Sequence, residues 1–73
     1  MIKSSFPIKL KMLREQRGLS QKGMANLIGV SKQNVCDWEN EKSQTSFENL
    51  EKIAKALQVT ADYLIETYDT DND

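Results

Sequence analysis

Apolar residues recur along the chain at the three- and four-residue spacing of helices, in five stretches separated by polar or glycine-containing segments. The first stretch begins at Pro7, because the N–H that proline lacks would be unpaired in a first helical turn, and it stops at Gly18. Its apolar positions are Ile8, Leu10, Met12 and Leu13. The sequence shows neither the alternation of a strand nor an internal repeat, so the pattern predicts helices only.

Two short helices are predicted next, joined by a tight turn. Ser20 is a favourable N-cap for the second helix, and Gly29 ends that helix in the left-handed conformation. Ser31 then caps the third helix only two residues later. The inward-facing residues expected in these two helices are Met24, Leu27, Ile28, Val35 and Trp38.

Residues 40–46 form the longest internal loop, and a fourth helix follows it. Either Thr45 or Ser46 can cap that helix, and Thr45 has capping-box spacing to Glu48. The apolar stripe of the fourth helix is Phe47, Leu50, Ile53, Ala54 and Leu57. Thr60 caps a short fifth helix. The apolar residues of the fifth helix are Tyr63, Leu64 and Ile65.

The five helices predict an all-α fold, a compact bundle that occupies residues 7–66, and 73 residues leave room for one domain. The acidic segment 67–73 has only Tyr68 to bury, so we expect a disordered tail. Apolar runs stay well short of the roughly 20 residues of a membrane span. The first five residues also lack the apolar stretch of a signal peptide, and we therefore expect a cytoplasmic protein without membrane partners.

The formal net charge of −1 does not by itself indicate a nucleic-acid partner, but the charges are unevenly distributed. Residues 1–44 carry eight basic and four acidic side chains, a net charge of +4, whereas residues 45–73 carry a net charge of −5. A chain polarised in this way can present a positive face to phosphate groups. The alternative interpretation is a solvated surface whose imbalance has no function.

Several kinds of chemistry are absent from the sequence. The chain has no histidine and one cysteine, Cys36, so we expect neither a zinc site nor an internal disulfide, in agreement with a reducing cytosol. It also lacks a glycine-rich phosphate loop and a pair of residues that would serve as nucleophile and base. We therefore predict that the protein is not an enzyme and needs no metal or cofactor.

Residues 21–40 combine the special positions that a tight helix-turn-helix requires. Ala25 is the small residue needed where the second of these helices crosses the first. Four residues later Gly29 supplies the positive φ of the turn. The apolar residues that would fill the wedge between the helices are Met24, Ile28, Val30, Val35 and Trp38.

The stretch from Leu10 to Leu64 resembles the Cro/C1-type (XRE-like) helix-turn-helix domains of phage and bacterial repressors. The resemblance is carried by Leu-Arg-Glu-Gln-Arg-Gly-Leu-Ser-Gln (13–21), Ala25, Ile-Gly-Val-Ser (28–31), Val35, Trp-Glu-Asn (38–40) and Ile-Ala-Lys-Ala-Leu (53–57). It implies a lambda-repressor-like bundle in which helices 2 and 3 form the helix-turn-helix and helix 3 lies in the major groove. It further implies a bacterial or phage repressor, located at the nucleoid, that binds a palindromic operator as a homodimer.

The sequence departs from the family pattern at two positions that bear on helix ends. Gly23 stands where the family usually has Glu, which removes the capping box after Ser20. Glu41 replaces the usual Gly after Asn40, which places a non-glycine residue at a helix end and a carboxylate near the DNA backbone.

Two sets of residues are candidates for contact with double-stranded DNA, although exposed polar residues on a helix are often only solvated. Glutamine pairs bidentately with adenine, lysine reaches guanine O6 and N7, and aspartate accepts from cytosine N4. The predicted base-reading residues are Lys32, Gln33, Cys36 and Asp37. The predicted phosphate-contacting residues are Gln21, Lys22, Ser31, Asn40, Lys42 and Ser43. The resemblance also implies that the amide of Gln21 buttresses Gln33.

An ion pair is predicted between Arg14 and Glu39. Arg14 borders the buried side of the first helix, and Glu39 lies at the end of the third helix, where the helix dipole disfavours a carboxylate. A guanidinium beside Glu39 offsets that cost, and arginine suits a partly buried bidentate pair. The family resemblance implies the same partnership.

The dimer and the function leave alternatives open. Tyr63, Leu64, Ile65 and Tyr68 are either the dimer interface or the closing edge of the monomer core. A second function is the antitoxin of a toxin–antitoxin operon, and a third is a protein-interaction module whose DNA face has decayed. Asp37, Glu41 and the acidic tail favour the third function. A toxin or an antirepressor would be the protein partner.

Overall fold

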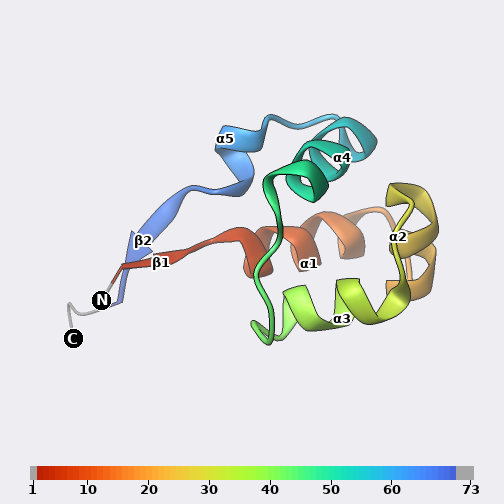
Figure 1. The fold of residues 1–73 in the computed structure, drawn as a ribbon, viewed down its shortest axis with the longest axis horizontal. Helices are drawn as coiled ribbons and strands as arrows, with labels where there is room; N and C mark the ends of the chain where they lie inside the picture. Colours follow the sequence, from red (N-terminus) through yellow and green to blue (C-terminus); the bar gives the residue numbers. More distant parts are fainter. Residues whose placement is uncertain (1, 71–73) are drawn as a thin grey trace.

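A computed structural model describes residues 2–70, which form five helices and two short strands (Figure 1). The elements in chain order are β1 (Ile2–Ser4), α1 (Phe6–Gln16), α2 (Gln21–Ile28), α3 (Lys32–Glu39), α4 (Phe47–Leu57), α5 (Ala61–Leu64) and β2 (Thr67–Asp69). The helical bundle predicted from the apolar spacing is confirmed, with a small two-stranded ribbon added to it. Among the described residues, no helix has the length and apolar character required to cross a membrane.

Hydroxyl side chains cap the four later helices. Ser20, Ser31 and Ser46 each accept a hydrogen bond from the backbone N–H three residues ahead, at 3.0, 3.1 and 3.1 Å, and Thr60 does so at 3.0 Å. Such a cap typically contributes about 1 kcal/mol to helix stability. Ser46, and not Thr45, is therefore the N-cap of α4, and the Thr45 hydroxyl donates to the carbonyl of Ser46 at 3.3 Å.

One hydrophobic core lies between the helices, and each of the five contributes to it. Leu10, Met24, Val35, Ile53 and Leu64 are completely buried. The remaining buried residues are Phe6, Leu13, Ala25, Ile28, Trp38, Leu50, Ala54 and Leu57. The rings of Phe6 and Trp38 meet edge to face, with centroids 6.1 Å apart, and this contact joins the start of α1 to α3.

Four residues of the predicted apolar stripes are exposed, which corrects the sequence interpretation. The buried line of α1 is Phe6, Leu10 and Leu13, so Ile8 and Met12 fall on its outer side. Leu27 and Phe47 are also exposed, and Phe47 most of all, at 72%. The first turn of α4 extends past the end of the core, and its helical periodicity alone does not reveal this.

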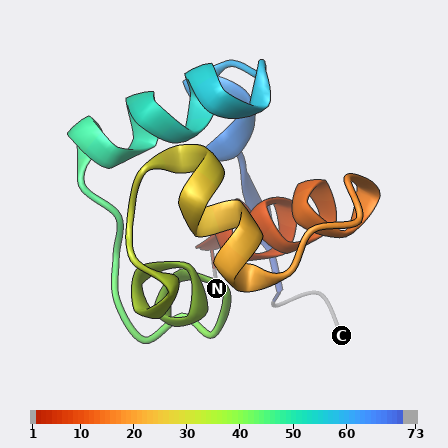
Figure 2. The same ribbon diagram turned by 90° about the vertical axis from the view of Figure 1, so that its right-hand side faces the viewer.

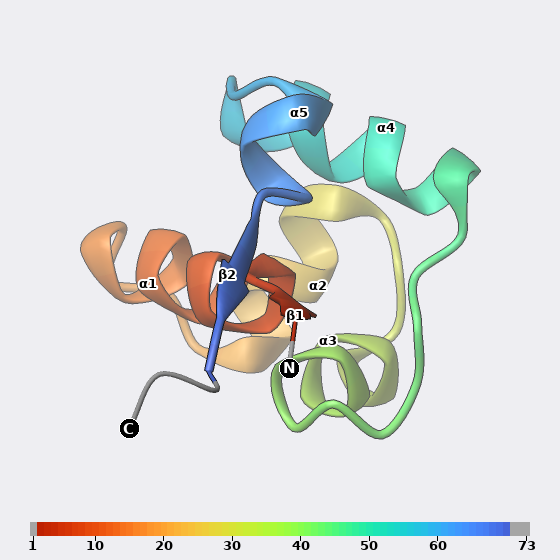
Figure 3. The ribbon, with the colours of Figure 1, turned by 90° about the vertical axis from the view of Figure 1, so that its left-hand side faces the viewer.

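The expectation of helices only, followed by a disordered tail from residue 67, is wrong for Thr67–Asp69. This segment pairs antiparallel with Ile2–Ser4 in the register Ile2↔Asp69, Lys3↔Tyr68 and Ser4↔Thr67 (Figure 3). Each strand has three residues, which is too short for alternation to be recognised, and each pairs with a segment at the other end of the sequence. Residues 71–73 of the predicted tail lie outside the described residues.

Side chains of α1 and the residue before it fasten the segment that leads into the ribbon. The hydroxyl and the N–H of Ser5 both donate to the carbonyl of Glu66 at 2.7 Å, which explains why this hydroxyl does not cap α1. The ammonium of Lys9 donates to the carbonyl of Tyr63 at 2.6 Å, pairs with the carboxylate of Glu66 and lies 4.0 Å from the centre of the Tyr63 ring. These contacts hold the segment that precedes β2 against the start of α1.

Candidate nucleic-acid interface

Helices α2 and α3 form the tight helix-turn-helix that the sequence predicts (Figure 2). Gly29 has φ +91°, and its N–H and that of Val30 both donate to the carbonyl of Ala25, at 2.8 and 2.9 Å. A Cβ on Gly29 would meet nothing within 4 Å, so the turn requires glycine for its backbone conformation and not for space. Ala25 is buried under the crossing, as expected.

The third helix has one buried and one open side. Val35 and Trp38 face the core, whereas Lys32 and Gln33 are exposed at the start of the helix. Of the other predicted base-reading residues, Cys36 and Asp37 are half-buried. The structure thus leaves the predicted reading residues on the accessible side of α3, which lies along the lower edge of the molecule in Figure 1.

Two of the predicted base-reading residues are hydrogen-bonded to each other. The amide nitrogen of Gln33 donates to Oδ1 of Asp37 at 2.8 Å, one helical turn further along the same face. This contact was not predicted from the sequence. Its signal is the spacing of four residues between an amide and a carboxylate on a helix, at which such pairs meet.

The predicted ion pair between Arg14 and Glu39 is present and bidentate. Nε of Arg14 lies 2.7 Å from Oε2 of Glu39, and Nη2 lies 3.1 Å from Oε1. A third guanidinium nitrogen donates to the carbonyl of Leu19 at 2.9 Å. The hydrogen bonding of Arg14 to the Glu39 carboxylate, which accepts, is the largest cause that raises the pKa of Arg14 above its ordinary value. The pair joins α1, α3 and the connection before α2.

Gln21 takes a different partner from the one that the resemblance implied. Its amide nitrogen donates to Oε1 of Glu39 at 3.2 Å, and Gln33 is bonded to Asp37. The expectation that Gln21 buttresses Gln33 is therefore wrong in this structure. The carboxylate of Glu39, which accepts hydrogen bonds from Arg14 of α1, also accepts the hydrogen bond from Gln21.

The predicted phosphate contacts lie at the ends of the two helices and in the loop after α3. Gln21 and Lys22 begin α2, Ser31 is the N-cap of α3, and Asn40 is its C-cap. Lys42 and Ser43 follow in the loop and are exposed. The N-terminus of α2 and the whole of α3 share one edge of the molecule, so these positions flank the open side of α3 (Figure 1).

The loop after α3 begins with a strained residue. Glu41, at the position where the family usually has glycine, has φ +60°. Left-handed backbone costs a residue with a side chain roughly 1 kcal/mol. Two hydrogen bonds hold the turn, from the N–H of Glu41 to the carbonyl of Trp38 at 3.3 Å and from the N–H of Lys42 to that of Asp37 at 2.8 Å.

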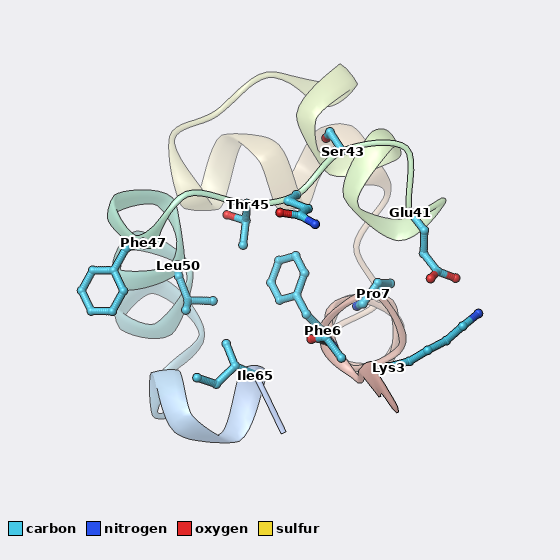
Figure 4. Close-up of a pocket in the computed structure, with 11 residues that line it drawn as sticks. Lys3, Phe6, Pro7, Glu41, Ser43, Thr45, Phe47, Leu50 and Ile65 are labelled. Carbon is cyan, nitrogen blue, oxygen red and sulfur yellow. Dashed lines mark hydrogen bonds between the residues drawn. The ribbon is translucent and has the colours of Figure 1, made fainter. Parts of the chain in front are cut away.

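A groove of about 540 Å³ lies beside this loop, between the start of α1, the α3–α4 loop, α4 and the end of α5 (Figure 4). The sequence pattern does not predict this groove. The rings and aliphatic side chains along the groove are those of Phe6, Pro7, Phe47, Leu50 and Ile65. Lys3 and Glu41 lie together at the end away from Phe47.

Comparisons with known proteins agree with this architecture. A family model described as helix-turn-helix matches residues 10–64. The chain is 30% identical over 57 residues to repressor protein C2 of Salmonella phage P22, an alignment that covers 78% of this chain and 26% of C2. It is 35% identical over 60 residues to the HTH-type transcriptional activator BcrR of Enterococcus faecalis, covering 82% of this chain and 29% of BcrR.

The crystal structure of the P22 c2 repressor in complex with a synthetic operator superposes on this fold with a TM-score of 0.78 at 28% identity. The match covers 84% of this chain and 92% of that chain. The chain therefore belongs to the Cro/C1-type helix-turn-helix family, whose members are DNA-binding transcription regulators, and its fold is lambda-repressor-like. It spans only about a quarter of the length of C2 and of BcrR.

Proposed function

We propose that this chain is a sequence-specific repressor that binds a palindromic operator as a homodimer, with α3 in the major groove of each half-site. The observation that carries the proposal is the exposed polar side of α3, presented by a fold similar to that of a repressor whose structure contains an operator. In this arrangement Lys32, Gln33, Cys36 and Asp37 face base edges. Because its partner is DNA, the protein acts in the cytoplasm at the nucleoid.

The phosphate contacts belong to the same proposal. The N–H groups at the start of α2, together with Gln21 and Lys22, face one phosphate backbone. Ser31, Asn40, Lys42 and Ser43 face the backbone at the two ends of α3. These contacts set the position of the protein on the duplex and carry no sequence information, so they contribute equally on all DNA.

The groove beside the α3–α4 loop is the surface that we assign to the second copy. Of the residues predicted for a dimer, Leu64 is completely buried in the core, whereas Ile65 and Tyr68 are exposed at 46% and 38%. Ile65 and Phe47 both line the groove, and the side chain of Phe47 is 72% exposed. In a twofold dimer the same surface of each copy contacts that surface of the other. The exposed Phe47 ring and the apolar groove belong to one surface, so the ring of one copy can contact the groove of the other.

Selection of bound sites from random duplex DNA tests the proposal. We expect enrichment of a palindrome whose half-sites are about one helical turn, roughly 34 Å, apart. Enrichment of a single half-site would exclude binding as a homodimer but would support sequence-specific DNA binding. If no sequence is enriched at low salt, the protein is not a sequence-specific DNA binder.

One observation favours a second function, a protein-interaction module or an antitoxin. The groove and the exposed Phe47 ring also suit an apolar segment of another protein, such as a toxin or an antirepressor. A competition experiment distinguishes a second copy from another protein as the occupant of the groove. A protein partner that occupies the groove would block dimer formation and lower operator affinity. A partner that binds elsewhere would leave dimer formation unchanged.

A further inference from the structure

Asp37 contacts the side chain of Gln33, and this contact restricts what Gln33 can present to DNA. The distance between the amide nitrogen of Gln33 and Oδ1 of Asp37 is 2.8 Å. An ionised carboxylate only accepts hydrogen bonds, so the amide nitrogen of Gln33, and not its oxygen, must face Asp37. The chemistry of the pair therefore fixes which of the two amide atoms, the nitrogen and not the oxygen, lies toward Asp37.

The fixed amide leaves one acceptor and one donor for a base. One of the two amide hydrogens is used by Asp37, which leaves the oxygen Oε1 and the second N–H of Gln33. Gln33 is exposed on the open side of α3, so both groups remain accessible. The pair thus offers an acceptor and a donor side by side at a defined position on the helix.

We infer that Asp37 is a positioning residue that makes Gln33 read adenine and reject guanine. This inference rests on the proposed function, since it concerns the major-groove contact of α3. Adenine presents the N6 donor beside the N7 acceptor, which complements Oε1 and the remaining N–H. Guanine presents two acceptors, O6 and N7, and Oε1 would face O6 without a hydrogen between them.

Rejection of guanine follows from the cost of turning the amide over. Rotation by 180° exchanges the two amide atoms and would bring the NH2 group to O6 of guanine as a donor, but it would also place Oε1 against the carboxylate of Asp37, acceptor against acceptor. In a glutamine without this neighbour the amide turns freely, so its NH2 group can donate to O6 or N7 of guanine and both purines are tolerated. The carboxylate also lowers the affinity for every DNA sequence, because its negative charge is near the phosphates.

A helix-stabilising contact is the simpler interpretation, because glutamine and aspartate four residues apart stabilise isolated helices slightly. That role would not alter the ratio of affinities for two base pairs. The adenine-to-guanine ratio at the position read by Gln33 is therefore the decisive quantity, and total affinity is not.

The experiment measures dissociation constants for four duplexes that contain the selected site and differ only at the base pair where Gln33→Ala reduces discrimination. A bidentate contact discriminates by about 5- to 150-fold, so we expect the unmodified protein to prefer adenine over guanine by roughly tenfold or more. Asp37→Ala and Asp37→Asn should reduce this ratio to about threefold or less and bind all four duplexes at least as tightly. Asp37→Glu retains an acceptor four residues from Gln33 and should keep the preference.

Glu15→Gln is the charge-matched control, because it removes one negative charge from an exposed residue of α1 that does not line the groove and has no hydrogen bond to Gln33 among the described residues. It should change the affinity for all four duplexes by the same factor and leave the ratio unchanged. An unchanged ratio in both Asp37→Ala and Asp37→Asn overturns the inference, as does a preference of the unmodified protein for guanine or a lack of effect of Gln33→Ala. If the unmodified protein selects no site at all, the proposed function itself fails.

Discussion

Arg14 and Glu39 form a bidentate ion pair that ties α1 to α3, with their side chains only 13% and 3% exposed. Charges so far removed from water require one another, because each would otherwise lack compensation for its lost hydration. The pair also offsets the negative end of α3, where Glu39 is the last helical residue. The orientation of α3 therefore depends on an interaction with α1.

Removal of one partner of this pair should be costly. We expect Arg14→Met and Glu39→Gln each to lower the free energy of unfolding by about 3–5 kcal/mol, because the other charge remains buried without its partner. The double variant should lose clearly less than the sum of the two, and thermal or urea unfolding of all four proteins measures the difference. Gln21→Ala, which removes only a hydrogen bond to Glu39, is the control and should cost about 1 kcal/mol. Strictly additive single losses below about 1 kcal/mol would contradict a buried pair.

The turn between α2 and α3 gives a second prediction. Gly29→Ala should lower stability by about 1–2 kcal/mol, because φ +91° is unfavourable for alanine even where its Cβ has room. For a domain of this size the melting temperature should fall by about 4–8 °C per kcal/mol. Gly23→Ala is the control, because Gly23 lies within α2 and a Cβ there makes only ordinary contacts at 3.4 Å or more. It should stabilise the protein by up to about 1 kcal/mol, and equal losses at the two glycines would refute the backbone explanation.

The groove gives a third prediction, which concerns the dimer. Phe47→Asp should abolish self-association in sedimentation or light-scattering measurements and leave the monomer folded, because Phe47 is 72% exposed at the start of α4. A carboxylate in the first turn is compatible with the helix dipole. Ile8→Asp changes an apolar residue of 55% exposure that does not line the groove, and it should leave self-association intact. Association that survives Phe47→Asp would place the dimer interface elsewhere.

Phosphate contact from the loop after α3 gives a fourth prediction. Lys42→Ala should weaken binding to specific and random DNA by similar factors and reduce the slope of log affinity against log salt by about one unit. Lys55→Ala, at the end of α4, removes the same charge from a helix outside the proposed DNA face and should leave the slope unchanged. A loss confined to the selected site would mean that Lys42 reads a base.

Helix positions were largely predictable because local chemistry determines them. Ser20 and Ser31 cap α2 and α3 through contacts three residues away, and Gly29 ends α2 through its own backbone. The ion pair of Arg14 and Glu39 was predicted from helix ends and family resemblance together, and the structure confirms it.

What could not be predicted depends on contacts between distant segments or on the limits of the core. The pairing of Lys3 with Tyr68 joins the two ends of the sequence over only three residues per strand. Phe47 has the spacing of a core residue, but the bundle ends before it. Gln21 was expected to buttress Gln33, and only the assembled fold shows that its amide bonds to Glu39 instead.

The most direct test of DNA recognition by α3 is the affinity for the selected duplex and for a scrambled duplex, measured across a range of salt concentrations. We predict that both affinities fall linearly with log salt, with a slope near −0.9 for each phosphate contacted. At physiological salt the selected duplex should bind roughly 10³-fold or more tightly than the scrambled one. Equal affinity for the two duplexes, or no binding at low salt, would contradict the assignment of α3 as a sequence-reading helix.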